Sequence, residues 1–418
     1  MVHKKKQIDY LLLLAILGLL IIGVILITSI GVPKSIQLTK DAGVLFPQCG
    51  QDGVDCFYLV KKHLWRLIIA VIGFFIAIKM PYTIWKKMAV PLFVSSFCVL
   101  VFVLAAGKAF STFATSWLVI GGNSLQPTEF AKLGLIAYLA VWLAQKGKDI
   151  EDFKKGFMSF VVLIGIATLP ILMQPDLGGT MVFMLIAVGL YFLAGAPIKH
   201  MAVGFTIGVL GLLIMLPIFS YQKSRVMAYL NPSEENCQVT KDGTRSDYCW
   251  QTTQANIAIG SGGFFGRGLT KGVQKSYWLP QASDDFIFAA SSEELGFVRI
   301  TLLVLLFGFI GYRGFMITRF APDRFSMFMA AGITLWIVGQ AFINIGVNTG
   351  LLPITGITLP FVSYGGSSLI ATLIGAGVLL NISKYSENYV TSGNNRRRNG
   401  GSHPAKRGSY RRTDFGSA

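Results

Sequence analysis

The feature that most constrains this chain is a series of ten apolar runs, each about as long as a membrane-crossing helix. An α-helix rises about 1.5 Å per residue, so about 20 apolar residues cross the roughly 30 Å hydrocarbon core of a bilayer. The runs cover residues 10–30, 64–84, 88–107, 128–145, 157–173, 178–195, 200–218, 285–311, 325–347 and 367–383. They predict an all-α polytopic membrane protein with ten transmembrane helices.

The composition agrees with a membrane protein. The chain is 53% hydrophobic and 14% charged, whereas soluble domains carry about 25% charged residues. The first run follows the letters HKKK and has no small-residue cleavage site after it. It is therefore predicted to be a retained span and not a removable signal peptide.

Lysine and arginine concentrate in alternate loops, which predicts an orientation. With a cytoplasmic N-terminus, the inner segments hold about 22 of the 37 Lys and Arg residues. An even number of spans then places the C-terminus in the cytoplasm too. The net charge of +17 is mostly an inner-leaflet effect, so anionic membrane lipid is the expected partner and nucleic acid is not.

Four of the five cysteines fall in two predicted outer loops. Cys49 and Cys56 share the first, and Cys237 and Cys249 share the largest. Both pairs face the oxidising side of the membrane, so two local disulfides are expected. A zinc site made of all four thiolates is the alternative, although no CxxC spacing is present.

The chain is predicted to form one transmembrane domain, residues 1–389, followed by a disordered, basic cytoplasmic tail, 390–418. A large extracytoplasmic loop, 219–284, separates helices seven and eight. The outer segment 348–368 is too apolar for a solvated loop and too rich in Pro and Gly for a helix. Such backbone survives at membrane depth only where protein or a water-filled cavity satisfies it, so the working face is expected to be the outer one.

Six motifs on the outer face resemble the SEDS family (shape, elongation, division and sporulation), the FtsW/RodA/SpoVE proteins of bacterial wall synthesis. They are SLQPTEFAKLGL (124–135), QPDLGG (174–179), SRVMAYLNP (224–232), NIAIGSGGFFGRGL (256–269), LPQASDDFIFAASSEELGF (279–297) and LLPITGITLPFVSYGGSSL (351–369). They occur in family order across nearly the whole chain. The EELGF form resembles the FtsW branch more than the RodA branch.

This resemblance implies a peptidoglycan glycosyltransferase with a ten-helix bundle. The family polymerises lipid II, a disaccharide-pentapeptide carried by undecaprenyl pyrophosphate, at the outer face of the bacterial cytoplasmic membrane. It works with a class B penicillin-binding protein, and the FtsW branch with other division proteins. A lipid II flippase, a RodA-type elongation polymerase and a scaffold that only recruits the penicillin-binding protein are the alternatives.

Asp285 is the candidate catalytic base. Joining two lipid II units needs a group to take the proton of the attacking sugar hydroxyl, and positive groups or a metal for the leaving pyrophosphate. Asp285 matches the DFIFA motif of the family and is predicted in the first turn of the eighth helix. An ordinary helix-capping role is the alternative. The neighbouring Asp284 is expected to act as a cap, or to raise the pKa of Asp285 by like-charge repulsion.

Further polar residues on the outer face are candidates for binding substrate. Glu129 and Lys132 share a helix face, either as a local ion pair or to bind pyrophosphate. Glu293 and Glu294 lie too far along the helix to act with Asp285, so structural pairing is expected for them. Of the two, Glu293 is the candidate to line the cavity floor. The remaining substrate-binding candidates are Asp176, Arg225, Arg267, Lys271, Ser363 and Tyr364. Asp176 could instead cap a helix. The three cations are candidates to bind pyrophosphate, with ordinary solvated loop charges as the alternative. No metal ligands are assigned, and a divalent cation, Mg²⁺ or Mn²⁺, stays open as a cofactor.

Overall fold

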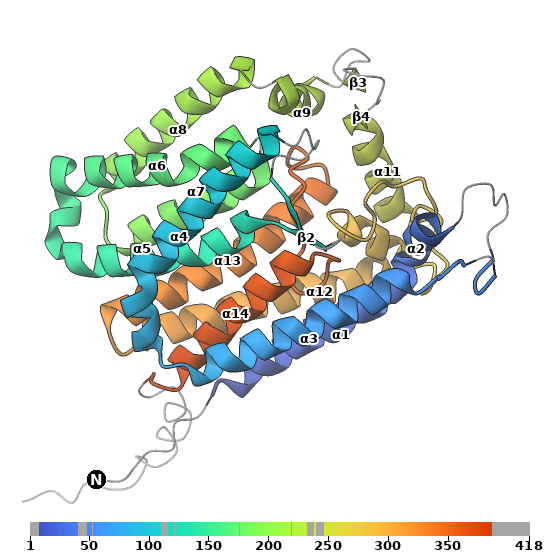
Figure 1. Ribbon diagram of the computed structural model, residues 1–418, viewed down its shortest axis with the longest axis horizontal. Helices are drawn as coiled ribbons and strands as arrows, with labels where there is room; N and C mark the ends of the chain where they lie inside the picture. The colour runs from blue at the N-terminus through green and yellow to red at the C-terminus, as the bar shows by residue number, and fades with distance from the viewer. Residues whose placement is uncertain are drawn as a thin grey trace, which may run out of the picture.

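Most of each of the ten apolar runs is helical in the computed structural model (Figure 1). The structure describes residues 8–40, 48–51, 53–109, 116–120, 123–174, 176–218, 220–231, 238–239 and 246–386. These helices are α1 (Tyr10–Ile30), α3 (Tyr58–Lys79), α4 (Tyr82–Ala109), α5 (Pro127–Lys146), α6 (Ser159–Met173), α7 (Leu177–Leu193), α8 (Ile198–Ile218), α12 (Ile287–Arg319), α13 (Arg324–Asn348) and α14 (Gly366–Ser383). The shorter elements are α2 (Val32–Thr39), η1 (Gly147–Glu151), η2 (Phe153–Met158), α9 (Ser220–Leu230), α11 (Tyr248–Ser261) and the strands β1 (Leu118–Ile120), β2 (Asn123–Leu125), β3 (Gln238–Val239) and β4 (Ser246–Asp247).

The chain is a multi-pass helical membrane protein. Within the described residues, seven helices are long and apolar enough to cross a bilayer, and α7 and part of α8 are shorter apolar helices. α3 carries Lys61, Lys62 and Arg66 near its start and Lys79 at its end, which lowers its mean hydropathy. The total of ten spans stays a prediction.

Segments predicted to share the inner side lie together. The amide of Asp9, before α1, donates a 3.1 Å hydrogen bond to the hydroxyl of Ser383 at the end of α14. The side chain of Asn381 donates to the carbonyl of Ile78, near the end of α3, at 2.6 Å. The two ends of the described chain are therefore on one side of the bundle, as an even number of spans requires. That this side is cytoplasmic stays a prediction.

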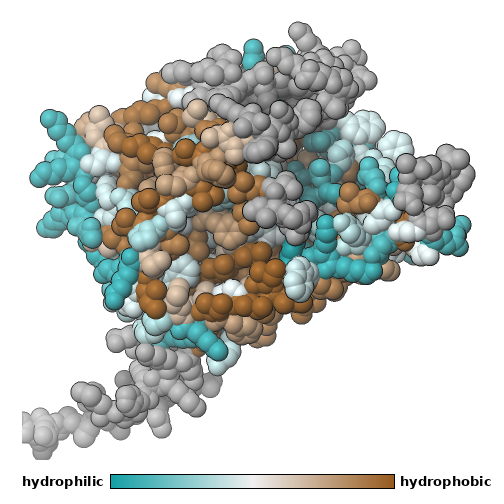
Figure 2. All heavy atoms as spheres, in the orientation of Figure 1, coloured by the Kyte–Doolittle hydropathy of each residue, from teal (hydrophilic) through white to brown (hydrophobic). Residues whose placement is uncertain are grey.

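The surface between the two ends of the bundle is largely hydrophobic. Figure 2 shows hydrophilic side chains at the ends and a broad apolar surface between them. On α1 alone, Leu11, Leu14, Ile21 and Ile25 are exposed. A contiguous apolar surface of this kind is unfavourable in water but suits contact with lipid chains.

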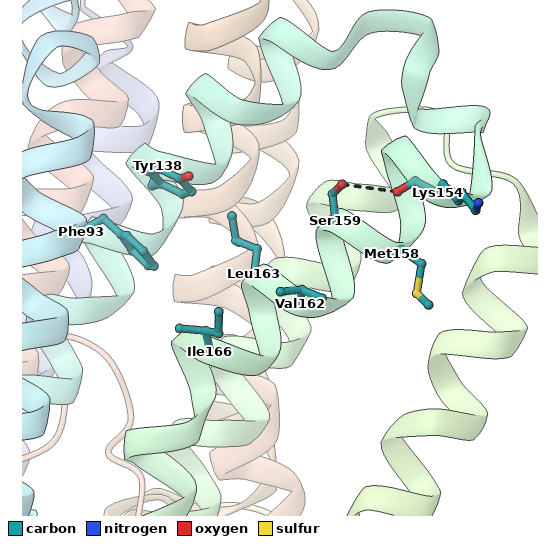
Figure 3. A pocket seen from close by; sticks show the side chains of 8 residues that line it. All are labelled: Phe93, Tyr138, Lys154, Met158, Ser159, Val162, Leu163 and Ile166. Atoms are coloured by element: carbon teal, nitrogen blue, oxygen red, sulfur yellow. Dashed lines mark hydrogen bonds between the residues drawn. The ribbon is translucent and has the colours of Figure 1, made fainter.

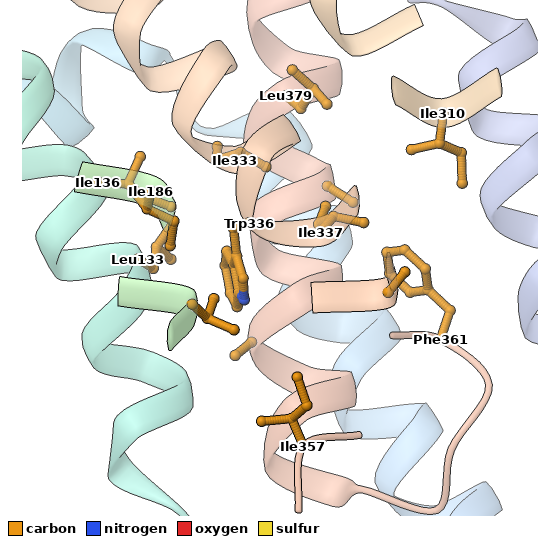
Figure 4. Close-up of a cluster of buried hydrophobic side chains, with 14 of the residues drawn as sticks. Leu133, Ile136, Ile186, Ile310, Ile333, Trp336, Ile337, Ile357, Phe361 and Leu379 are labelled. Atoms are coloured by element: carbon orange, nitrogen blue, oxygen red, sulfur yellow. The ribbon is translucent and has the colours of Figure 1, made fainter. Parts of the chain in front are cut away.

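The core is centred on α13, whose Trp336 is fully buried. Residues of α5, α7 and α14, including Ile136, Ile186 and Leu379, surround it (Figure 4). Gly375 of α14 leaves room for the indole, since a Cβ there would lie 3.1 Å from Trp336 Cζ3. Lipid is as apolar as these side chains, so close packing and buried hydrogen bonds hold such helices together.

The structure corrects several predicted boundaries. The boundary between the predicted spans 64–84 and 88–107 is shifted, because α3 ends at Lys79 and α4 begins at Tyr82. Two small antiparallel hairpins, β1–β2 and β3–β4, interrupt the all-α pattern. The large loop 219–284 contains the helices α9 and α11. The tail 390–418 lies outside the described residues.

One of the two expected disulfides is present, between Cys49 and Cys56. It closes the turn that leads into α3. Cys237, which was expected to pair with Cys249, lies outside the described residues, so that bond stays a prediction.

α12 is broken at Gly296, where the backbone takes φ 74° and ψ 175°. The glycine-rich loop 262–268 fills the break through four backbone hydrogen bonds of 2.9–3.2 Å. They run from the amides of Arg267 and Gly268 to the carbonyls of Glu293 and Glu294, and from the amides of Phe297 and Val298 to the carbonyls of Gly263 and Phe264. The loop thus satisfies backbone groups that the break in the helix leaves open.

Candidate active site

Asp285 lies two residues before α12, so the prediction that it occupies the first helical turn is wrong. A ladder of buried amides on α13 holds it. Gln340, Asn344 and Asn348 follow at intervals of four and therefore share one helix face. The side chains of Asn344 and Asn348 donate to the Asp285 carbonyl at 2.8 and 2.9 Å. Buried amides in a membrane helix are a sequence signal of a functional site. The prediction of site residues from the motifs did not include these three side chains.

The same ladder fixes the non-helical segment opposite Asp285. Asn344 donates a 2.7 Å bond to the carbonyl of Ile357, and Gln340 donates a 3.1 Å bond to the carbonyl of Thr358. The segment 348–368 therefore satisfies its backbone through protein, as its composition predicted. It runs directly past the start of α12.

Arg225 and Asp285 meet at Gly356. A Cβ placed on Gly356 would lie 3.9 Å from Asp285 Oδ2 and 4.0 Å from Arg225 Nη1. Arg225, on α9, also donates from Nη1 to the carbonyl of Ile354 at 3.4 Å. Gly356 itself has φ 74°, a conformation that favours glycine. The structure therefore brings together the predicted base and one of the predicted pyrophosphate-binding cations.

Burial, together with the negative charge of Asp284, raises the pKa of Asp285 to about 7 against the opposing effects of Arg225 and Lys34. A carboxyl group with a pKa near the working pH exchanges protons readily in both directions. This is the property required of a general base.

Asp284 points to a different set of partners from Asp285. Its carboxylate forms an ion pair with Lys34 of α2 and accepts a 3.2 Å hydrogen bond from the hydroxyl of Ser283. Lys34 also donates to Gln281 at 2.8 Å. Lys34 was not predicted as a site residue, because nothing in its local sequence shows that α2 packs beside residue 284.

Ser363 and Tyr364 have different roles. The hydroxyl of Ser363 is buried and accepts a 2.8 Å bond from the amide of Leu359, so it stabilises the turn. Tyr364 is partly exposed, and its amide donates to the carbonyl of Ser283 at 2.9 Å. Tyr364 is therefore held beside the acidic pair.

Lys132 lies in a buried network near the start of α5. It is 0% exposed and donates 2.8 Å hydrogen bonds to Glu129 and to Gln340. Asp176 caps α7 by accepting from the amide of Gly179 at 2.7 Å. Burial raises the pKa of Asp176. The structure thus gives Lys132 and Glu129 the ion-pair arrangement and Asp176 the helix-capping arrangement.

Glu293 is buried at the break in α12, where it accepts bonds from the amides of Val273 and Gln274 at 3.0 and 2.9 Å. Arg267 lies 3.3 Å from it and is bound to this carboxylate. Glu294 pairs with Lys275 at 2.6 Å. Lys271 is exposed on the same loop. The structure therefore places Glu293 and Arg267 in the contact between loop and helix and not beside Asp285.

Two cavities of the described chain lie away from Asp285. The larger, of about 600 Å³, opens between α4, α5 and α6 near Lys154 and is mostly apolar (Figure 3). The smaller, of about 340 Å³, lies where α2 meets the loop at Lys275. Within the described residues, no group of three or more His, Cys, Asp or Glu side chains could hold a metal ion, so a divalent cation stays a prediction.

Comparison with known proteins extends across the whole helical region. The model of the FtsW/RodA/SpoVE family, described as cell cycle protein, matches residues 10–388. The chain belongs to this family. It is 40% identical to the stage V sporulation protein E of Bacillus subtilis over 92% of this chain and 100% of that protein. It is 36% identical to a probable peptidoglycan glycosyltransferase FtsW of Allochromatium vinosum over 91% of both chains.

Solved structures of the FtsW/RodA/SpoVE family share the fold. A chain of a peptidoglycan synthase complex, studied for its coordination of polymerization and crosslinking, superposes with a TM-score of 0.69 at 26% identity. It covers 91% of this chain and 99% of that one. The Thermus thermophilus rod-shape-determining protein RodA gives a TM-score of 0.60 at 26% identity, over 91% and 98%. The matched family region, 10–388, includes Lys34, Asp285 and Tyr364.

Proposed function

We propose that this protein is a peptidoglycan glycosyltransferase that polymerises lipid II into glycan strands at the outer face of the bacterial cytoplasmic membrane. The observation that carries the proposal is the position of Asp285, a partly buried carboxyl group beside Arg225 at the end of the bundle where α12 begins. Family membership supports it, since several relatives are named probable peptidoglycan glycosyltransferase FtsW.

In this proposal Asp285 takes the proton from the sugar 4-hydroxyl that attacks the anomeric carbon of the second lipid II. The bond from that carbon to the pyrophosphate oxygen breaks, and the negative charge develops on the pyrophosphate. Arg225, next to Asp285, would stabilise that charge. The amide ladder of α13 holds the Asp285 backbone in place, which favours a preorganised site.

We infer that the protein works with a class B penicillin-binding protein and other division proteins during septal wall synthesis. The similarity to a chain of a peptidoglycan synthase complex supports the first partner. The septal assignment rests on the FtsW-type relatives, while the similarity to stage V sporulation protein E makes spore-wall synthesis a related alternative. A RodA-type elongation polymerase is a further alternative, supported by the shared fold.

A lipid II flippase is the alternative from another class. A flippase needs polar groups along a path through the membrane. Here the ion pairs that involve Asp284, Glu293 and Glu294 gather around the start of α12 and its break. One buried ion pair, Arg313–Asp9, lies at the opposite end. The grouping of the other acidic side chains at the start of α12 favours chemistry at the surface over transport.

Purified protein with fluorescent lipid II in detergent, with and without a class B penicillin-binding protein, tests the proposal. Glycan ladders on a gel are the expected result. The same protein in sealed vesicles should leave lipid II on the leaflet where it was placed. Translocation of lipid II without polymer under any condition would contradict the proposal and support the flippase.

The pH dependence of polymerisation provides a separate test. A base works only when ionised, so kcat/KM should fall as the pH drops through about 7, the pKa of Asp285. Replacing Asp284 with asparagine removes a neighbouring negative charge that raises this pKa. The falling limb of the profile should therefore move to lower pH in the variant. An unchanged pH profile would mean that the ionisation controlling the rate is not that of Asp285.

A further inference from the structure

Arg66, eight residues into α3, lies beside the start of α14. Its guanidinium carbon is 4.9 Å from the centre of the Tyr364 ring. A Cβ added at Gly366 would be 2.6 Å from Arg66 Cδ and 2.8 Å from its Nε. The amide of Tyr364 donates a hydrogen bond to the carbonyl of Ser283. This bond places Tyr364 and Arg66 next to the acidic pair that begins at Asp284.

The guanidinium of Arg66 and the N-terminus of α14 are both positive and lie side by side. α14 has 18 residues, and the N-terminus of a helix carries a partial positive charge of about half an elementary charge. Its N-cap, Gly365, has no side chain that could accept from the first-turn amides. None of the ion pairs among the described residues includes Arg66. The guanidinium and the helix start thus have no negative partner at salt-bridge distance within that part of the chain.

A buried histidine is a second feature that points to an anion site. His63 precedes Arg66 by three residues, so the two share a face of α3. Its ring lies 6.1 Å from the Tyr364 ring and is 1% exposed. Its Nδ1 atom is buried and has no hydrogen-bond partner within the described residues. Buried polar atoms are normally paired, so an unpaired one beside a cation points to a bound group.

We propose that Arg66, His63, Tyr364 and the first turn of α14 form an anion subsite for the diphosphate of one lipid-linked substrate, separate from the position of Arg225. The inference rests on the proposed function, because joining two lipid-linked units requires two diphosphates to be held at once. One diphosphate leaves and the other stays on the growing chain. Arg225 lies beside Asp285. Arg66 lies against the ring of Tyr364, whose amide is bonded to the carbonyl of Ser283.

The chemistry of the subsite matches a diphosphate. A guanidinium presents a planar set of donors that fits phosphate oxygens in pairs. Helix N-termini bind phosphate through their free amides. Burial raises the pKa of Tyr364, so its hydroxyl remains a donor at neutral pH. Arg66, Tyr364, Gly365 and Gly366 are all partly exposed, so a ligand can reach them.

Titration of the full-length protein in detergent with inorganic pyrophosphate tests the subsite, and the KM for fluorescent lipid II is measured in parallel. Arg66→Gln should weaken pyrophosphate affinity about tenfold or more and raise KM, because it removes a charged hydrogen-bond donor. Arg66→Lys keeps the charge but loses the planar fork, so an intermediate loss is expected. Lys61→Gln is the matched control, since Lys61 lies at the same end of α3 and pairs only with Asp55 in the described chain. It should bind like wild type.

The controls separate failure of this proposal from failure of the proposed function. Pyrophosphate binding needs no base, so Asp285→Asn should bind it with near wild-type affinity while losing polymerisation. If the wild type makes no polymer but Arg66→Gln still loses pyrophosphate, the subsite stands and the polymerase does not. Wild-type pyrophosphate affinity in folded Arg66→Gln and Arg66→Lys would overturn the subsite. Equal competition by phosphatidylglycerol would overturn the diphosphate assignment in favour of an ordinary lipid headgroup.

Discussion

Replacing Asp285 with asparagine is expected to lower the rate of glycan polymerisation by about 10²–10⁴-fold, the usual contribution of a general base. Asparagine has nearly the same shape, so the bonds from Asn344 and Asn348 to the backbone carbonyl of residue 285 remain. It cannot accept the proton of the attacking hydroxyl. The loss should therefore appear in kcat, with KM for lipid II much less affected.

Asp284→Asn is the matched control for this experiment. It removes the adjacent carboxylate and its ion pair with Lys34, which is partly exposed to solvent. Because exposed ion pairs contribute little to stability, the protein should stay folded and keep polymerisation within about tenfold of wild type. Equal loss in both variants would show that the acidic pair acts structurally. Full activity of Asp285→Asn would rule out Asp285 as the base.

The helices were predictable because membrane spans obey simple physical limits. A span needs a long apolar run with all backbone groups bonded internally, so each run in the sequence contains a helix. The ends were less certain. Lys86 and Lys87 fall between the predicted spans 64–84 and 88–107, yet both lie within α4. Long basic side chains at a helix end can reach the interface while their backbone stays helical.

Site residues could be predicted from the sequence only where the charge of a single side chain suggests its chemical role. Asp285 and Arg225 were named from their motifs, and the structure brings them together at Gly356. Lys132 was named on the same grounds, but it is enclosed by Glu129 and Gln340. Burial of this kind depends on which helices pack together. Nothing in the sequence of α5 alone indicates that Lys132 contacts Gln340 on α13.

The contact between the glycine-rich loop and α12 was also beyond the sequence. The loop 262–268 could be flexible or tightly held, and its glycines fit both. The structure decides the matter through close approach. A Cβ on Gly266 would lie 2.2 Å from the carbonyl oxygen of Glu294, and a Cβ on Gly296 would lie 2.1 Å from the amide nitrogen of Gly266. Neither position leaves space for a side chain.

Gly296→Ala should therefore destabilise the protein by about 2–4 kcal/mol, which combines a strained backbone with a steric clash. At φ 74° and ψ 175° the backbone lies in a region that essentially only glycine occupies. The added methyl would also push the loop away and break its bonds to Glu293 and Glu294. Thermal unfolding in detergent measures the effect.

Gly308→Ala provides the matched control, because both glycines belong to α12. Apart from the adjoining residues and the nearby backbone of α12 itself, no atom of the described chain lies within 4 Å of a Cβ at Gly308. Alanine inside a helix is favoured over glycine by about 0.5–1 kcal/mol, so this variant should unfold at the same or a slightly higher temperature. Glycine-to-alanine substitution is thus expected to lower the unfolding temperature at position 296, and to leave it unchanged or raise it slightly at position 308. A small effect at Gly296 would mean that the loop tolerates displacement, and that the break in α12 does not depend on the glycine.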